Sequence, residues 1–506
     1  MKLERTKNAS RNTFFGALLK LYQIVIPFLM RTIMIYFLGM EYLGLNSLFS
    51  SILQILNLAE LGVGSAMIFS MYKPIAEDDD KKICALMRLY KTYYRIIGIL
   101  VLCLGLILLP FVPSLIKKGT PEGINVYILY LLHLGTTVLS YWLFAYKNCL
   151  LAAHQRTDIT SKITMIMNTL QYVLQIICIV VFKNYYFFLV VALVSQIGIN
   201  IVTAVVVSKK YAQYKAYGKL DKEEVRDING RVRDLFTAKL GAVIINSADS
   251  VVISAFLGLE ILAIYQNYYF ILTSIIGIVG TAFTACIAGI GNSIIMESKE
   301  KNYNDLNKFT FIIVWISGIC SCCLMGLYQP FMEIWVGKEN ILGLSAVMCF
   351  VVYYFIYEIN QLLNMYKDAA GLWHEDRFRP LVTALSNLAL NLILVNIIGI
   401  YGVLLSTVLT MLGIGMPWLI HNLFSVLFKM KPWNYLKKML KYVAVVVVSV
   451  MISHCIADFI KEVSIVTLII KGIICVVIPN VIYFVCFRRT EEFKQMIQLI
   501  KKIIKR

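Results

Sequence analysis

Six basic side chains lie inside stretches of the chain that are otherwise apolar enough to cross a bilayer. They are Lys20, Arg31, Lys91, Arg95, Lys239 and Lys471. A cation in hydrocarbon costs about 2.5–3.5 kcal/mol or more on insertion scales, so such residues usually face water, a protein partner or a ligand. The pattern predicts an interior that receives an anionic group.

Lys20 and Arg31 are the first two candidates for contact with that anion. They are eleven residues apart, which brings them to nearly one face of a helix, about 16 Å apart along its axis. Pro27 lies between them and removes a backbone hydrogen bond, so we expect a hinge there. The alternative is that Lys20 reaches back to the membrane surface and that Pro27 is only a packing kink.

Arg95 and Lys239 are the other two candidates. Arg88, Lys91 and Arg95 form one basic stripe at helical spacing, and Arg95 lies deepest in its apolar run. Arg88 and Lys91 are equally well explained as anchors at the membrane surface. Lys471 stands apart from the other five cations, and we expect it to make a peripheral lipid or packing contact.

Three carboxylates also fall in apolar runs: Glu60, Asp249 and Glu358. A carboxylate within a membrane must pair with a cation, take up a proton or bind a cation. Glu60 lies near the depth of Lys20, so an ion pair between them is one reading and a proton-carrying role is the other. Arg31 is a candidate partner for Asp249. The three carboxylates are therefore predicted to carry a proton or another cation, or to form ion pairs.

The composition identifies a polytopic membrane protein. The 506 residues are 59% hydrophobic and 15% charged, whereas soluble domains are about 45–50% apolar and about 25% charged. The net charge of +19 lies mostly between the apolar runs, which argues against a nucleic-acid partner. The twelve cysteines fall mainly within apolar runs and are expected to pack rather than bind metal.

Sequence signatures of an enzyme are missing. There is no GxxxxGK[ST] phosphate-binding loop, and the outer connections are too short for a catalytic domain. The Asp78-Asp79-Asp80 run is followed by two lysines and is expected to be a solvated charge run. We predict a protein that is not an enzyme and needs no cofactor.

The expected fold is all-α, with about fourteen membrane-spanning helices of about 20 residues or more. The predicted spans are 14–39, 42–71, 85–113, 124–151, 160–182, 185–207, 235–257, 260–296, 309–335, 341–366, 380–400, 402–428, 438–459 and 464–487. Lys and Arg concentrate in the connections on the side that carries both termini. The opposite side has only Lys117, Lys118, Lys183, Lys338 and Lys461. The positive-inside rule then places both termini in the cytoplasm.

A repeated segment suggests two related halves. Phe37-Leu38-Gly39-Met40-Glu41-Tyr42-Leu43 matches Phe256-Leu257-Gly258-Leu259-Glu260-Ile261-Leu262, and the same register aligns Lys20 with Lys239. We predict two six-helix lobes related by a pseudo-twofold axis along the membrane normal. The predicted division is an N-terminal lobe at 1–208, a cytoplasmic linker at 209–233, a C-terminal lobe at 234–428, an extra helix pair at 429–487 and a basic amphipathic tail at 488–506. The apolar face of that tail suits an anionic membrane surface.

The segments Leu151-Ala152-Ala153-His154-Gln155-Arg156 and Asn246 to Gly258, together with Arg31 and the Phe37-Leu38-Gly39 turn, resemble the polysaccharide-biosynthesis flippases. These proteins share a superfamily with the multidrug exporters and the peptidoglycan lipid flippases. The resemblance covers essentially the whole chain. It implies a flippase of the bacterial cell membrane that carries an oligosaccharide, linked through pyrophosphate to a polyprenol, from the cytoplasmic to the outer leaflet by alternating access.

The implied partners are that lipid-linked oligosaccharide, anionic membrane lipids, polysaccharide-assembly enzymes and a coupling ion such as a proton or sodium. Two alternatives stay open. An ion-coupled exporter of organic cations would use Asp249, Glu60 and Glu358, and a peptidoglycan lipid-precursor flippase would use the same cations for a different glycan. The glycan, the energy source and the oligomeric state are not determined by the sequence.

Overall fold

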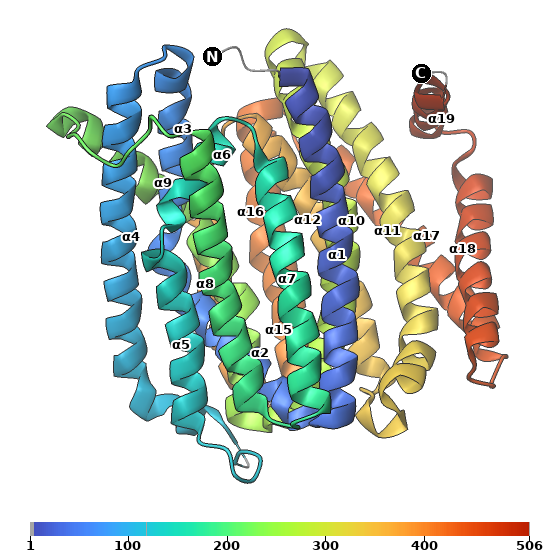
Figure 1. Ribbon diagram of the computed structural model, residues 1–506. Helices are drawn as coiled ribbons and strands as arrows, with labels where there is room; N and C mark the ends of the chain where they lie inside the picture. The colour runs from blue at the N-terminus through green and yellow to red at the C-terminus, as the bar shows by residue number, and fades with distance from the viewer. Residues whose placement is uncertain (1–4, 118, 505–506) are drawn as a thin grey trace. The chain divides into compact units, whose positions relative to one another are not determined.

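The computed structural model of the protein describes residues 5–117 and 119–504, and these form helices and connections without a strand. The first part of the chain contains α1 (Arg5–Phe37), α2 (Met40–Leu56), η1 (Asn57–Glu60), α3 (Val63–Ala76), α4 (Asp80–Leu108), η2 (Leu109–Leu115), α5 (Val126–Trp142), η3 (Ala145–Lys147), α6 (Asn148–Ala153), α7 (Thr157–Val180), α8 (Tyr185–Lys210) and α9 (Lys222–Leu257) (Figure 1). The predicted Lys118 lies outside the described residues.

The second part contains α10 (Leu259–Met296), α11 (Lys299–Val336), η4 (Lys338–Asn340), α12 (Leu344–Ala369), α13 (Trp373–Asp376), α14 (Arg379–Ile398), α15 (Ile400–Thr410), η5 (Met411–Gly415), α16 (Met416–Asn422), η6 (Leu423–Phe428), α17 (Trp433–Asp458), α18 (Ile465–Phe487) and α19 (Glu491–Ile504). The segments η5 and η6 are π-helical turns within one helical span, Ile400–Phe428. The all-helical prediction is confirmed.

Twelve of the described helices are long and apolar enough to cross a membrane, and the α5–α6 pair, bent by 47°, makes a thirteenth. The predicted span at 42–71 is not one helix. It is divided into α2 and α3 because η1 tightens the chain and Gly62 takes a left-handed conformation with φ of 88°. The break places the Glu60 carboxylate at the junction of two short helices.

The chain folds as two compact units, Met1–Ala263 and Ile264–Arg506. The boundary differs from the predicted linker at 209–233. The second half of that linker is helical and opens α9, where Glu223 and Glu224 in the first turn favour a helix start. Because α9 packs on α2 and α3, it belongs to the first unit.

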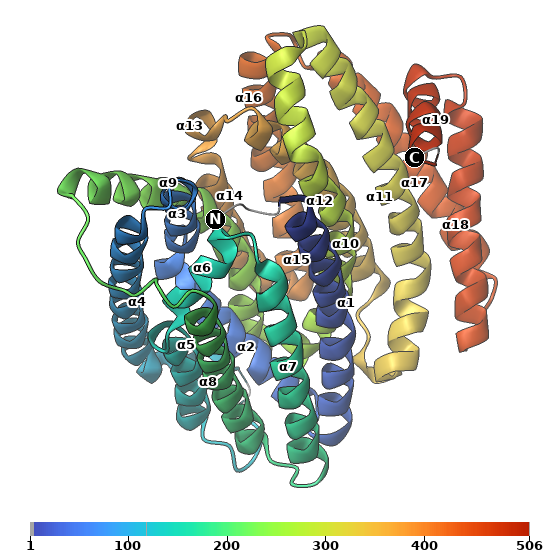
Figure 2. The same cartoon turned by 45° about the horizontal axis from the view of Figure 1, so that its top comes forward.

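In the first unit, neighbouring helices form a continuous series of packed pairs: α1 with α7, α7 with α8, α8 with α5, and α5 with α4 (Figures 1 and 2). The start of α9 extends over the ends of α3 and α4, which is clearest in the tilted view of Figure 2. The break after α2 is therefore enclosed by α4, α5 and α9.

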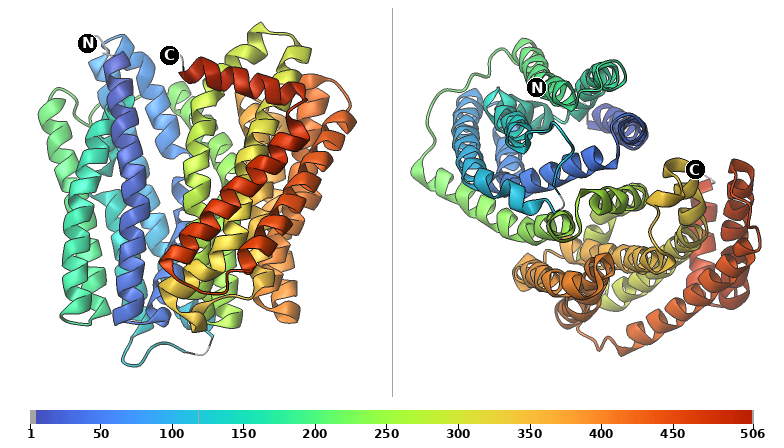
Figure 3. Two further views of the ribbon diagram at one scale, coloured as in Figure 1. Left: turned by 90° about the vertical axis from the view of Figure 1, so that its right-hand side faces the viewer. Right: turned by 90° about the horizontal axis from the view of Figure 1, so that it is seen from below.

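In the second unit, α17 and α18 pack on α11 (Figure 3). Small residues on α11 allow the close approach, since a Cβ added at Gly318 would lie 2.1 Å from the Tyr483 hydroxyl. Lys471 on α18 is buried, in keeping with a packing contact.

Part of the apolar face of the C-terminal helix α19 packs on the protein itself, while the expectation that the 488–506 tail suits an anionic membrane surface stays a prediction. Phe493, Met496 and Ile497 pack against the core of the second unit, and Lys438 binds Glu492 at 2.7 Å. The rings of Phe311 and Trp315 on α11 supply a surface that buries these apolar residues within the protein.

The repeated turn motif has one backbone geometry in both copies. Gly39 between α1 and α2 has φ of 105° and ψ of 170°, and Gly258 between α9 and α10 has φ of 100° and ψ of 173°. Side-chain-bearing residues rarely adopt this conformation, so both glycines are required by the backbone.

Replacing Gly39 with alanine should therefore lower the free energy of unfolding by about 1–3 kcal/mol, the cost of a residue held in a disfavoured backbone region. No neighbouring atom lies within 4 Å of the added Cβ, so the loss would come from the backbone alone. Thermal unfolding in detergent measures it. Gly16→Ala, at an open position within α1, is the control and should be neutral or stabilising. Equal stability of the two variants would contradict this account of the turn.

Candidate functional site

The Glu60 carboxylate is held by tyrosines at the break between α2 and α3. Its Oε1 accepts a hydrogen bond of 2.8 Å from the Tyr94 hydroxyl, and its Oε2 accepts one of 2.9 Å from Tyr141. The Tyr141 hydroxyl also lies 3.0 Å from Asn57 Oδ1, and Tyr90 donates to Tyr94 at 2.5 Å. Glu60 is thus the centre of a polar network within the first unit.

The ion pair considered for Glu60 and Lys20 is not formed among the described residues. Because η1 tightens the chain before Gly62, the Glu60 side chain reaches α4 and α5 and takes its hydrogen bonds from them. Sequence reasoning missed Tyr94 and Tyr141 as its partners. Tyrosine is frequent throughout the chain, and only the break in the second span could have indicated which ones matter.

Lys239 on α9 lies beside the same break. Its Nζ donates to Ser65 Oγ at 3.5 Å, and Ser65 lies in the first turn of α3. One turn earlier on α9, Leu235 approaches Gly62 so closely that an added Cβ would lie 2.7 Å from Leu235 Cβ. The close packing at Gly62 therefore positions Lys239, whose side chain is exposed.

Lys20 and Arg31 share a face of α1, which runs through Pro27 as one helix. On the other side of α1, Tyr22 contacts Thr169 of α7 at 3.0 Å, beside an apolar groove of about 410 Å³. Lys20 therefore points away from α7. It is exposed and makes no hydrogen bond or ion pair within the described part of the chain, whereas Arg31 is half-buried.

Arg95 lies in a different environment, between α4 and the α5–α6 break. Trp142 Nε1 donates to the Arg95 carbonyl at 3.3 Å. The Arg95 side chain is exposed and lies on α4, whereas Lys20 lies on α1 and Lys239 on α9.

Asp249 is buried on α9 within a polar strip. Ser247 in this strip donates to Gln54 Oε1 of α2 at 3.0 Å, and Ser254 donates to the Leu115 carbonyl at 2.7 Å. These two hydroxyl hydrogen bonds fix the rotation of α9 against α2 and η2. Gln54 is another residue that sequence reasoning did not select.

Glu358 on α12 is the most deeply buried of the three carboxylates. Its exposed fraction is 0%, and neither carboxylate oxygen has a hydrogen-bond partner among the described residues. Tyr354, Tyr357 and Cys320 lie near it. An ionised carboxylate is costly in such a place, so this group is stable when it holds a proton or a cation.

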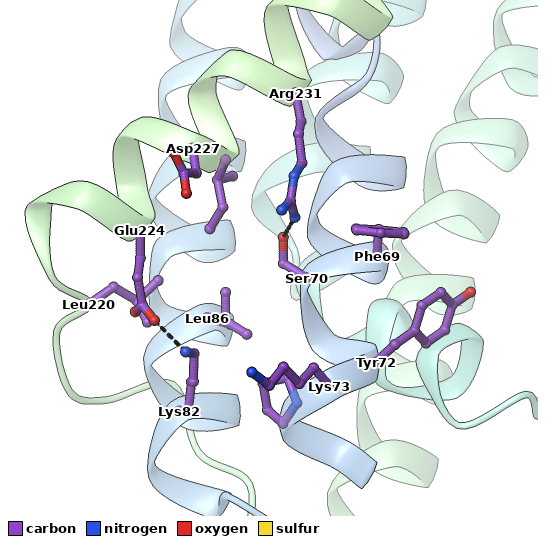
Figure 4. A pocket seen from close by; sticks show the side chains of 12 residues that line it. Phe69, Ser70, Tyr72, Lys73, Lys82, Leu86, Leu220, Glu224, Asp227 and Arg231 are labelled. Atoms are coloured by element: carbon purple, nitrogen blue, oxygen red, sulfur yellow. Dashed lines mark hydrogen bonds and ion pairs between the residues drawn. The ribbon is translucent and has the colours of Figure 1, made fainter. Parts of the chain in front are cut away.

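A pocket of about 400 Å³ lies where α9 begins, between α3 and α4 (Figure 4). Arg231 of α9 donates to Ser70 Oγ at 3.3 Å and its guanidinium lies 5.0 Å from the Phe69 ring. Figure 4 shows Lys82 of α4 paired with Glu224 of α9 on the opposite side of this pocket. These contacts hold the start of α9 on α3 and α4.

The segment after α6 that carries the family resemblance has a structural role. Asn12 of α1 donates to the Gln155 carbonyl at 3.0 Å and accepts from the Asp158 backbone N–H at 2.9 Å. Arg156 Nε donates to the buried Asp158 carboxylate at 2.8 Å. The His154 ring packs against Tyr211 at a tilt of 33°, with ring centroids 4.4 Å apart, and burial lowers the pKa of His154.

Replacing Asn12 with alanine should lower the free energy of unfolding by about 1–3 kcal/mol, because one backbone donor and one carbonyl lose their partner together. Thermal unfolding in detergent would show a lower midpoint. Gln23→Ala on the same helix removes an amide without a hydrogen bond among the described residues and should leave the midpoint unchanged. A similar midpoint for both variants would exclude this role for Asn12.

Comparisons with known proteins identify the family and the fold of this chain. The profile of a family described as polysaccharide biosynthesis protein matches residues 9–288, more than half of the chain. No characterised protein matches significantly by sequence.

Solved structures share the fold. The inward closed conformation of the lipid II flippase MurJ superposes with a TM-score of 0.70 at 15% identity, covering 94% of this chain and 99% of that one. An inward-facing multidrug resistance MATE transporter of the MOP superfamily gives a TM-score of 0.59 at 16% identity, covering 80% and 97%. A Vibrio cholerae MATE transporter gives 0.53 at 16% identity, covering 82% and 97%.

These neighbours are flippases and transporters, and the helices of this chain have the length and apolar character of a multi-pass membrane protein. The chain therefore belongs to the polysaccharide biosynthesis protein family and has the fold of the MOP superfamily.

Proposed function

We propose that this protein is a flippase for a polyprenyl-pyrophosphate-linked oligosaccharide, which it carries from the cytoplasmic to the outer leaflet of a bacterial cell membrane. The termini and the basic connections would face the cytoplasm. The two predicted lobes, whose sequences repeat the Gly39 and Gly258 turns, would rock to alternate access.

The observation that carries this proposal is a pair of lysines in spanning helices without a counter-ion. Lys20 on α1 and Lys239 on α9 are exposed, and neither binds a carboxylate within the part of the chain that the structure describes. A lone ammonium group at membrane depth is costly, and a pyrophosphate headgroup supplies the missing negative charge. Arg31, on the same face of α1 as Lys20, would add a third contact.

The sugar–pyrophosphate headgroup cannot cross hydrocarbon without replacing its hydration. The lysines would replace water around the phosphates, while the polyprenol chain stays in lipid. Glu358 would carry the coupling ion, because its buried carboxyl is stable only when neutralised. Asp249 and Glu60 would tune the site, with Glu60 anchored by its tyrosines.

A second candidate function, ion-coupled export of organic cations, is favoured by the buried carboxylates Asp249 and Glu358. A peptidoglycan-precursor flippase, the third candidate, differs from the first only in its glycan. Assembly enzymes for polysaccharide would supply or remove the substrate of either flippase.

Equilibrium binding to the purified protein separates the flippase from the exporter. A polyprenyl-pyrophosphate oligosaccharide should bind, and free pyrophosphate should compete with it, whereas a lipophilic organic cation should bind weakly. Tight binding of the organic cation that is unaffected by pyrophosphate would instead support the exporter.

A further inference from the structure

Three basic side chains gather around Tyr146, where α5 breaks into η3 and α6. Lys91 Nζ of α4 lies 5.7 Å from the Tyr146 ring centroid, and Lys147 follows Tyr146 in the chain. α4 packs against η3, which carries Lys147, and Arg95 lies one turn beyond Lys91 on α4, where its carbonyl accepts a hydrogen bond of 3.3 Å from Trp142 Nε1. We call Lys91, Arg95 and Lys147 the Tyr146 cluster.

The cluster has no acidic partner among the residues that the structure describes. Lys147 Nζ donates to Ser208 Oγ of α8 at 2.6 Å. None of the three cations pairs with a carboxylate in the ranges 5–117 and 119–504. At the same end of the first unit Lys82 pairs with Glu224, whereas the exposed Lys81, Lys209 and Lys222 form no ion pair among the described residues. Like charges held together in a membrane protein are unfavourable unless an anion joins them.

The local backbone holds aromatic side chains beside these cations. Phe144 has φ of 60° and ψ of 12°, a left-handed conformation that is strained for a residue with a side chain. Lys147 Nζ lies 5.5 Å from the Phe144 ring centroid. The Trp142 indole lies against Gly98, where an added Cβ would approach Nε1 to 2.1 Å. The side chains of Trp142 and Phe144 are 42% and 46% exposed, so these two rings at the edge of the cluster are accessible from outside the protein.

The position along the helices matches a membrane surface. Ser208 lies at the end of α8, which terminates at Lys210, and Lys91 lies in the first half of α4. Tryptophan and other aromatic residues are enriched at headgroup depth, and basic residues beside them meet anionic lipid.

We propose that the Tyr146 cluster binds the phosphate of an anionic phospholipid headgroup, with the exposed rings of Trp142 and Phe144 beside its acyl chains. Three cations around one phosphate provide charge-assisted hydrogen bonds to its oxygens and relieve their mutual repulsion. This site depends on membrane insertion and not on the proposed transport of an oligosaccharide.

Lipid titration of the delipidated full-length protein, read by native mass spectrometry, tests the site. Phosphatidylglycerol should bind to the wild type in preference to phosphatidylcholine. The Lys91→Gln, Arg95→Gln and Lys147→Gln triple variant should lose affinity for phosphatidylglycerol by about tenfold or more. The matched control, Lys81→Gln with Lys209→Gln and Lys222→Gln, removes the same charge from exposed residues at this end of the unit and should stay within about twofold of the wild type.

A second measurement needs no charge variant. Phosphatidylglycerol brominated on its acyl chains should quench tryptophan fluorescence in the wild type more strongly than in Trp142→Phe, and brominated phosphatidylcholine should show no such difference. Equal lipid affinity of the triple variant and its control, or quenching that does not depend on Trp142, would overturn the proposal. Binding of polyprenyl phosphate but not phosphatidylglycerol would also overturn it, since the occupant would then be the lipid carrier.

Discussion

Replacing both Lys20 and Lys239 with glutamine should reduce transport of a lipid-linked oligosaccharide by about 100-fold or more while the protein remains folded. Loss of a charged partner from a desolvated pair costs about 2–5 kcal/mol, which corresponds to a factor of about 30 to several thousand. Neither lysine forms an ion pair within the described residues, so the stability of the protein should change little.

Two matched variants sharpen this prediction. Lys239→Arg keeps the charge and should retain most of the transport, whereas Lys222→Gln, in the exposed first turn of the same helix, should have no effect. Transport is measured in proteoliposomes, and folding by thermal unfolding in detergent. Wild-type transport by the double glutamine variant would rule out a cationic headgroup site at these residues.

Glu358→Gln should abolish the response of transport to an imposed ion gradient. Glutamine keeps the shape of a protonated carboxyl but cannot release a proton or hold a cation. The side chain at position 358 would therefore stay neutral throughout the transport cycle. Because neither Glu358 oxygen has a hydrogen-bond partner among the described residues, the neutral amide should not lower the unfolding temperature.

The gradient response is measured as the ratio of transport rates with and without a proton or sodium gradient. That ratio should fall to about 1 in Glu358→Gln. Glu339→Gln, in the exposed connection after α11, serves as the control and should keep the wild-type ratio. An unchanged ratio in Glu358→Gln would assign coupling to another group.

The sequence was sufficient to predict the elements that depend only on residues close together in the chain. Apolar length gave most of the spanning helices, and the repeated motif predicted two turns whose glycines share one backbone conformation. The break at Asn57–Glu60 was missed because the residues on both sides of it are equally apolar. An amphipathic pattern likewise does not reveal which apolar residues meet lipid and which, like Phe493 and Met496 of α19, pack on the protein.

Residue types in the candidate site could be predicted, but their partners could not. The cost of charge in a membrane singled out Lys20, Lys239 and Glu358 without any knowledge of the fold. The tyrosines that hold Glu60 lie on α4 and α5, and only tertiary packing identifies them. Arg95 was likewise selected for its depth in an apolar run, but the Trp142 indole that donates to its carbonyl could not be predicted.

The proposed function is movement of a pyrophosphate-linked lipid between leaflets. Its most direct test is a proteoliposome assay in which a polyprenyl-pyrophosphate oligosaccharide starts in one leaflet and its appearance in the other is followed with a membrane-impermeant glycan-modifying reagent. We expect exposure that is faster with protein than without it and that is lost in the Lys20→Gln, Lys239→Gln variant. If the protein transports an organic cation in the same vesicles but does not accelerate exposure of the lipid-linked oligosaccharide, the proposed function is contradicted and the protein is an exporter.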